Sequence, residues 1–380
     1  MNVTRAFRRL IRVTPTRWRM PSRRALWMVV AILFLSSSIA LALHDSPEQR
    51  VVEAPAPVEE GLAVQTVEQA KTDSVAPAPP PTAKKEDGRS SSTAKAPPKP
   101  KPAPPRRPAG LGGAAGTAAY RGMGTWVDVY DWSATYARGG PQISPDAVDR
   151  MAEQGVQTLY IQASKHDAPS DVLEADLLRR WIDKARGQGI RVVAWYLPTL
   201  VHPARDLARM RAIGALPVDS VAVDIESKDV AQLEERNRRL VAFSADVRRA
   251  LPGRSIGGIV LPPVVLEAVN PAYWPSFPYR QLVPYYDVWM TMGYWTNRAS
   301  GTTYRDANRY TTENVKRLRA NLGLPGALVH PIGGIADRTT AVDVAGYRRA
   351  VSDTDGIGAS LYDWRTTRPE LWESLRAFRR

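Results

Sequence analysis

The sequence predicts an α/β fold, a (β/α)8 barrel of the TIM type, over residues 119–380. Three observations support this prediction. Eight short runs rich in β-branched and aromatic residues recur along the region. Helix-like stretches with recognisable start and stop signals lie between most of them. The region is also about 260 residues long, close to the typical length of a single such barrel.

The expected strands are short and the expected helices are longer and more charged. The strands are predicted at 125–132, 158–164, 191–198, 220–227, 255–262, 288–295, 328–334 and 359–364, and helices at 145–154, 173–188, 230–251, 311–322 and 341–351. Pro145 fits a first helical position, and Gly155 and Gly189 fit helix ends. An open doubly wound sheet is the alternative, although no glycine-rich phosphate loop follows the first strand.

The N-terminal part of the chain predicts export and a membrane anchor. Residues 1–24 hold eight arginines and no acidic residue, which is typical of a cytoplasmic segment. Residues 25–43 are uncharged and near the length that spans a bilayer, so we expect a single-pass signal anchor with the C-terminal domain extracytoplasmic. Cleavage after Ala42, at Ala40-Leu41-Ala42, would instead give a secreted protein. Ser22-Arg23-Arg24 is similar to a twin-arginine export signal.

Residues 44–118 predict a disordered linker rich in Pro, Ala and Lys. They contain no Phe, Trp or Tyr but 14 of the 32 prolines. Such a composition buries too little apolar surface to form a core. We interpret the segment as a passive spacer that carries the domain at 119–380.

Composition excludes several kinds of site. The chain has no cysteine, which rules out disulfides, thiolate metal sites, cysteine nucleophiles and a lipoprotein anchor. Much of the net charge of +14 comes from the basic N-terminus beside an apolar segment, so we expect no nucleic-acid partner. His166 and His202 follow predicted strands, and His330 lies within one. Because neither His-x-His on the first strand nor HExxH occurs, we expect no metal and no cofactor. A Ser-His-Asp hydrolase is also disfavoured, since no G-x-S-x-G motif is present.

Two carboxylates end the predicted fourth strand, SVAVDIES. Side chains alternate along a strand, so Asp224 and Glu226 share one face with the small residues Ser220 and Ala222. The β-branched side chains between them should pack against the outer helices. The acidic pair should therefore point into the barrel near its C-terminal rim, where barrel enzymes carry their chemistry. Like charges on one face repel each other, and this cost is usually tolerated for a function.

The first and last predicted strands add acids to the same rim. In Thr125–Trp132, alternation turns Trp126, Asp128 and Tyr130 inward, and Asp131 follows at the strand end. Asp363 and Trp364 end the last strand. Carboxylates with aromatic rings at one rim suggest glycoside hydrolysis, which needs an acid to protonate the leaving oxygen. The candidate sugar-binding aromatic residues are Tyr130, Trp132, Tyr196, Tyr294, Trp295 and Trp364, for each of which plain packing is the alternative.

The residues also resemble two glycoside hydrolase families. Gly124-Thr-Trp-Val-Asp-Val-Tyr-Asp-Trp132, with 155–167 and 189–198, resembles the first three strands of family 25 lysozymes, and Asp224-Ile-Glu226 matches the D-x-E of that family. This resemblance implies Glu226 as general acid, supported by Asp128 and Asp224. It weakens after the fourth strand.

The same acids are similar to part of the family 18 chitinase signature. Asp219-x-x-Ala222-x-Asp224-x-Glu226 resembles D-x-x-D-x-D-x-E, with Ala222 in place of an Asp, and Met292-Gly-Tyr294 resembles the sixth-strand M-x-Y. This resemblance implies a substrate-assisted mechanism in which Glu226 protonates the leaving group, Asp224 orients an N-acetyl group and Tyr294 helps to hold it. The S-x-G-G of a chitinase third strand is absent.

The combined prediction is an exported, membrane-tethered glycoside hydrolase-like protein. Its expected partners are a polysaccharide or peptidoglycan and, through residues 25–43, the membrane. The alternatives are a degenerate barrel that binds glycan without cutting it and a structural protein of the cell envelope. The choice between a lysozyme-like and a chitinase-like mechanism stays open at this point.

Overall fold

Eight parallel strands form one sheet in the computed structural model, which describes residues 116–379. They are β1 (Gly122–Val127), β2 (Thr158–Gln162), β3 (Arg191–Tyr196), β4 (Ser220–Ile225), β5 (Ile256–Val260), β6 (Val288–Thr291), β7 (Ile332–Ile335) and β8 (Gly358–Tyr362). Their order is β6-β5-β4-β3-β2-β1-β8-β7. Isolated bridges from Trp289 to Val329 and from Met292 to Ile332 join the two end strands. The predicted (β/α)8 barrel is confirmed, and the alternative prediction of an open doubly wound sheet is not.

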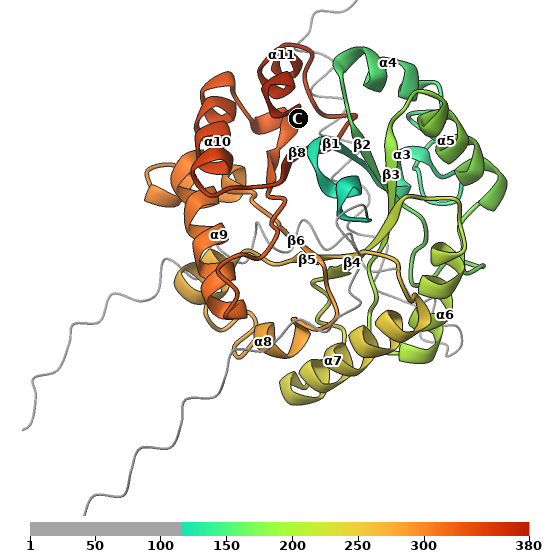
Figure 1. Ribbon diagram of the computed structural model, residues 1–380, viewed down its shortest axis with the longest axis horizontal. Coiled ribbons are helices and arrows are strands. Elements are labelled where there is room, and N and C mark those ends of the chain that lie inside the picture. The colour runs from blue at the N-terminus through green and yellow to red at the C-terminus, as the bar shows by residue number, and fades with distance from the viewer. Residues whose placement is uncertain (1–115, 380) are drawn as a thin grey trace, which may run out of the picture. The chain divides into compact units, whose positions relative to one another are not determined.

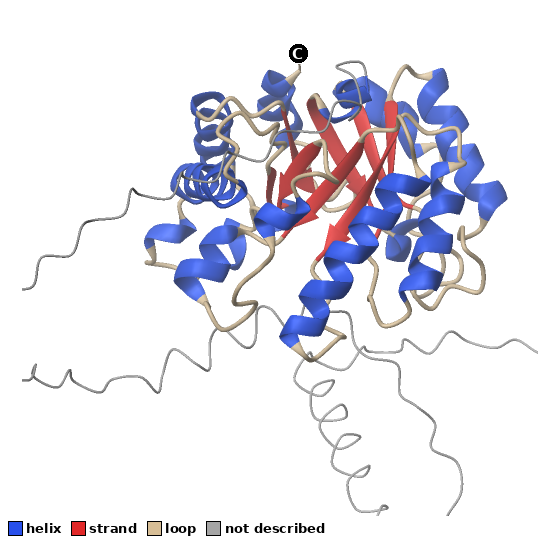
Figure 2. Cartoon of the chain, turned by 60° about the horizontal axis from the view of Figure 1, so that its bottom comes forward, coloured by secondary structure: helices blue, strands red, loops and turns tan. Residues whose placement is uncertain are grey.

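Helices form an outer layer around these strands (Figures 1 and 2). They are α4 (Ala147–Gln154), α5 (Ala175–Gly187), α6 (Pro203–Gly214), α7 (Leu233–Ala250), α8 (Tyr279–Leu282), α9 (Ala307–Leu322), α10 (Ala341–Asp353) and α11 (Leu371–Leu375), with the single turn α3 (Val129–Trp132) at the end of β1. The five predicted helices are confirmed in place. Helix α6 was not predicted, because only a narrow apolar stripe containing Met210 and Ile213 runs through its charged sequence.

All eight strands end or begin at other residues than predicted, and two of these differences have clear local reasons. The first strand was expected to continue to Trp132, but β1 ends at Val127. The Asp128 carboxylate there accepts a hydrogen bond from the Tyr130 backbone N–H and so starts α3. Strand β7 begins at Ile332 and not at 328, since Pro331 has no N–H to donate to a continuous ladder.

Tyr120 fills the amino-terminal end of the barrel. Its hydroxyl lies 2.8 Å from the Ser220 hydroxyl and donates to the Val221 carbonyl at 2.5 Å. A Cβ atom on Gly257 would come within 2.8 Å of the Tyr120 ring, so glycine at this position of β5 makes room for it. The bottom of the barrel is therefore closed by packing, and only the other end is available for a site.

The barrel centre holds a hydrogen-bonded network around His330. Trp126 donates its indole N–H to the Ser360 hydroxyl at 2.8 Å, which leaves Ser360 to donate to His330 Nε2 at 3.0 Å. His330 Nδ1 then carries the proton and donates to the Tyr120 carbonyl at 2.8 Å. His330 is fully buried, and burial lowers its pKa to about 4. This histidine is neutral and structural at neutral pH.

His330 should contribute to the loss of stability in acid. Its folded-state pKa lies below the unfolded value of about 6.5, so its contribution is full above that value and is lost as the pH falls toward 4. The shift corresponds to about 3 kcal/mol at most. We expect the free energy of unfolding, measured with urea at pH 7.5 and pH 4.5, to fall less in His330→Gln than in the native chain. Equal falls in the two proteins would contradict this assignment.

The membrane anchor predicted at residues 25–43 lies outside the described residues, as do the basic segment 1–24 and nearly all of the linker 44–118. Among residues 116–379, no helix combines the length and apolar character needed to cross a bilayer. The anchor and the linker therefore stay predictions from the sequence.

Candidate active site

Acidic side chains cluster at the carboxyl ends of three strands. Asp128 directly follows β1, Asp224 lies near the end of β4 with Glu226 just after it, and Asp363 directly follows β8. Because all eight strands are parallel, these ends lie at the same mouth of the barrel. The three strand ends fall into two groups, one at the neighbouring strands β1 and β8 and the other at β4.

Asp128 is fixed by contacts from both sides of the β1–β8 pair. One carboxylate oxygen accepts the Tyr130 N–H at 2.8 Å, and the other accepts the hydroxyl of Tyr362 at 2.6 Å. Trp126, two residues earlier, packs against Tyr362 with ring centroids 6.3 Å apart. Asp128 itself is 9% exposed. Asp128 is thus held rigidly at the mouth by a strand end, a helix start and a tyrosine.

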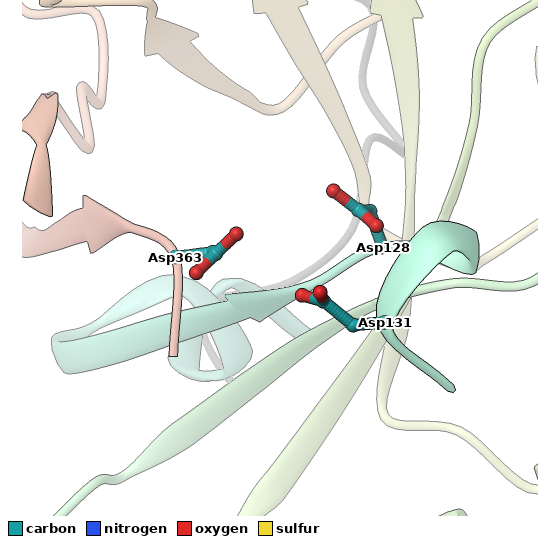
Figure 3. A group of neighbouring side chains, drawn as sticks. All are labelled: Asp128, Asp131 and Asp363. Atoms are coloured by element: carbon teal, nitrogen blue, oxygen red, sulfur yellow. The ribbon is translucent and has the colours of Figure 1, made fainter. Parts of the chain in front are cut away.

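Three carboxylates converge at the end of β1 and β8. Oxygen atoms of Asp128, Asp131 and Asp363 all lie within 4.8 Å of one another, and Figure 3 shows Asp131 and Asp363 turned toward each other beside Asp128. Arg365 donates from its Nε to Asp131, and the Thr366 N–H and hydroxyl donate to Asp363 at 2.8 and 2.9 Å. Among residues 116–379, this is the group of side chains that could hold a metal ion.

Burial and mutual repulsion favour protonation within this carboxylate cluster. Asp131 is 2% exposed, and burial, followed by the charges of Asp128 and Asp363, raises its pKa to about 7 despite Arg365. Burial and the charge of Asp128 likewise raise the pKa of Asp363. A carboxylic acid that retains its proton near neutral pH can act as a proton donor. The cluster therefore carries perturbed acids at the position expected for barrel chemistry.

Asp224 lies on the inward face of β4, and Glu226 follows just beyond the strand. Strand β4 runs from Ser220 to Ile225, and Ser220 contacts the interior residue Tyr120, so Asp224 continues the inward face. Asp224 is 7% exposed, whereas Glu226 is half-buried just beyond the strand. Burial and the negative charge of Glu226 raise the pKa of Tyr273 to about 12, which places Glu226 near that ring.

The ring of Tyr273, which lies near Glu226, also contacts a cation. The Lys228 ammonium lies 3.8 Å from the centroid of the Tyr273 ring. Burial and the charge of Arg236 lower the pKa of Lys228. A half-buried carboxyl beside a ring can hold a substrate oxygen while water is partly excluded, which is the setting that a general acid needs.

Three aromatic residues are positioned for contact with a ligand at the mouth. Tyr130 is 43% exposed on α3 and packs edge-on against Tyr136, with ring centroids 6.5 Å apart. Tyr294 and Tyr362 are both half-buried, with centroids 6.1 Å apart. Tyr130 and Tyr294 were predicted from the sequence, and both remain candidate sugar-binding residues.

Four other predicted aromatic residues are buried in the packing of the domain. Trp132 donates its N–H to the Gln162 carbonyl at 3.2 Å, and Tyr196 points away from the barrel interior and donates to Asp206 of α6 at 2.6 Å. Trp295 packs on Tyr347, and Trp364 packs on Trp372. None of the four is more than 8% exposed, so we leave Trp132, Tyr196, Trp295 and Trp364 out of the candidate site.

Sequence reasoning missed part of the site because its partners come from separate strands. Asp131 was noted only as a strand-end residue, and Tyr362, Arg365, Lys228 and Tyr273 were not named. The Asp-x-x-Asp spacing of 128 and 131 is a usable signal, since residues three apart share a face when the chain turns helical. Their partners, Tyr362 on β8 and Arg365 just after that strand, are each 234 positions away.

Two shallow hollows lie elsewhere, on the outer helices. One is lined by residues of α7 and α8, including Asn237, Val241 and Gln281, and the other lies between α7 and the start of α6, including Phe243 and Pro203. Neither contains an acid from the strand ends. The acids that line them, Glu234 and Asp246, lie on the outer helix α7 and not at the mouth of the barrel.

Solved structures of similar fold are glycoside hydrolases. The spore cortex-lytic enzyme SleL from Bacillus megaterium QM B1551 superposes with a TM-score of 0.51 and 7% identity, over 68% of this chain and 74% of that chain. A second protein, described as a glycoside hydrolase, gives a TM-score of 0.50 and 12% identity over 68% of this chain and 100% of that chain. No protein-family model and no curated protein sequence matches the chain. The resemblance to glycoside hydrolase barrels noted in the sequence is confirmed at the level of the fold, which by itself does not define an activity.

Proposed function

We propose that this protein is an exported glycoside hydrolase tethered to the membrane by residues 25–43, with Glu226 as the general acid. The observation that carries the proposal is the placement of Asp128, Asp224, Glu226 and Asp363 at the carboxyl ends of β1, β4 and β8, in two groups at one mouth of the barrel. Glycosidic cleavage requires a proton donor and a second group that stabilises the positive anomeric carbon. A barrel mouth with several partly buried acids supplies both kinds of group.

The two carboxylates of β4 have suitable and different environments. Glu226 is half-buried beyond the strand, so a leaving oxygen can reach it, whereas Asp224 is buried below it. In a substrate-assisted reaction Asp224 orients an N-acetyl group. In a double displacement a carboxylate attacks the anomeric carbon, and Asp128 and Asp224 are the candidates. Both mechanisms assign Glu226 the same role as proton donor.

A cell-wall glycan is the substrate class that we favour. An exported domain on a spacer of about 75 residues would act within reach of the membrane, on the order of 50 Å for a flexible coil. The similarly folded SleL is described as a spore cortex-lytic enzyme, which supports a peptidoglycan-like polymer. Tyr130, Tyr294 and Tyr362 provide ring faces for its sugars.

A glycan-binding protein without hydrolytic activity is the second candidate. Ala222 stands where the chitinase signature has an Asp, and Trp126, Tyr160 and Trp195 pack together inside the barrel. Because these rings fill the barrel interior, fewer groups are left there for catalysis, whereas the rim remains available for binding. This reading keeps the same substrate class but removes the chemical step.

Hydrolysis and binding can be separated with the purified chain. We expect reducing ends to appear when it is incubated with peptidoglycan or chitin. Saturable sedimentation with a glycan that stays intact after long incubation would establish the binding alternative. If the chain shows neither hydrolysis nor binding, both glycan readings are excluded and a structural protein of the cell envelope is favoured.

A further inference from the structure

The carboxylate cluster at the ends of β1 and β8 has the size of a cation site. Its members are Asp128, Asp131 and Asp363, whose ligand atoms lie within 4.8 Å of one another. Calcium binds oxygen at about 2.3–2.6 Å, so two ligands on opposite sides of one ion are separated by about 5 Å. A single ion between the facing carboxylates of Figure 3 could therefore contact all three residues.

One buried oxygen in the cluster lacks a protein partner. Asp131 is 2% exposed, and its Oδ2 forms no hydrogen bond with any residue from 116 to 379. The other oxygen contacts Arg365, and the carboxylate is directed toward Asp363. A buried acceptor without a donor is costly, and such atoms call for an explanation. An ion among the three carboxylates would satisfy it.

The charge of the cluster also favours a divalent ion. Ligation of a cation requires deprotonated carboxylates, so in the occupied site the three residues carry three negative charges, and Arg365, which contacts Asp131, supplies one positive charge. Two negative charges are left, which a divalent cation would neutralise. All donors are oxygen atoms, the set preferred by hard cations such as calcium and magnesium and unsuited to thiolate- or imidazole-binding metals.

We propose that Asp128, Asp131 and Asp363 form a calcium site that joins the start of α3 to the end of β8. Histidine motifs in the sequence do not reveal this site, because its ligands are carboxylates. They come from the first and last parts of the domain's sequence. By holding Asp128 and the Tyr362–Asp363 segment together, the ion would order one side of the barrel mouth. The site does not depend on the proposed hydrolysis.

Calcium binding is tested with the purified full chain after treatment with a chelator. Calcium is added from about 0.01 to 10 mM, and the melting temperature and the heat of binding are measured. We expect one ion per chain and a rise in melting temperature of about 5–10 °C at a concentration about 100 times the dissociation constant. Magnesium in place of calcium should bind more weakly, because it demands stricter octahedral geometry. No calcium-dependent change in either measurement would overturn the proposal.

Two variants and one control locate the ion. Asp131→Asn and Asp363→Asn should each abolish the calcium-dependent rise, whereas Asp337→Asn, at an exposed acid outside the cluster, should retain it. If one of the two cluster variants has too low a melting temperature to be studied, the other variant and the number of calcium ions bound per native chain still test the assignment. Calcium binding that survives in both variants would contradict the assignment. Glu226→Gln should bind calcium normally, so failure of this site and failure of the proposed hydrolase are distinguishable.

Discussion

Replacing Glu226 by Gln is expected to lower the kcat for glycan hydrolysis by about 10²–10⁴-fold. The amide has nearly the shape of the carboxyl group but cannot donate a proton to the leaving oxygen. KM should change little, because the lost interaction belongs to the transition state and not to substrate binding. Release of reducing ends at saturating substrate measures the effect, and unchanged turnover would remove Glu226 from its proposed role.

The control for this variant is Glu370→Gln, at an acid whose side chain is 61% exposed in the last part of the chain. It should retain full activity, and both variants should melt at the native temperature. The mechanism is then resolved with substrates whose N-acetyl groups have been removed. A substrate-assisted enzyme loses activity on them, whereas an enzyme with a protein nucleophile retains it.

Replacing Trp126 by Ala is expected to destabilise the domain by about 3–5 kcal/mol. The side chain is 2% exposed and stacks on Tyr160 with ring centroids 4.4 Å apart and planes inclined by 13°. It also contacts Trp195 and Tyr362 and donates to Ser360. Its removal leaves a cavity in the barrel centre and an unpaired acceptor. Urea unfolding at neutral pH measures the loss.

Tyr130→Ala provides the matched control. This residue is also aromatic but is 43% exposed on α3, so its truncation should change stability by about 0.5 kcal/mol or less. Trp126→Phe should recover part of the loss because a ring still stacks on Tyr160. A Trp126→Ala protein as stable as Tyr130→Ala would show that the barrel interior is not packed around this residue.

Much of the fold could be predicted because its signals are local. Strand β4 matches its predicted start at Ser220, since β-branched residues alternate there with small and acidic ones. Helix α7 lies within the predicted range 230–251, again because the signal for a helix is local to its own segment. The first strand was extended too far, because alternation continues past Val127 while the Asp128 side chain starts a helix. A side-chain cap overrode the strand pattern.

The aromatic part of the site was harder to predict. Tyr130 and Tyr196 look equivalent in the sequence, since both lie near predicted strand ends. Tyr130 is nevertheless exposed on a helix, whereas Tyr196 is buried and hydrogen-bonded to Asp206. Alternation gives the face of a strand but not which helix or loop covers that face. Burial of a ring at the rim depends on those later segments.

Periodicity and chain order were enough to predict the barrel, its parallel strands and the placement of Asp128, Asp224 and Asp363 at strand ends. The folded arrangement was needed to show that Asp131 joins Asp128 and Asp363, that Tyr362 and Arg365 contact them, and that Glu226 lies by Tyr273. These contacts arise because barrel closure places β8 beside β1. It brings together charges more than 230 positions apart, whose repulsion and burial no local pattern records.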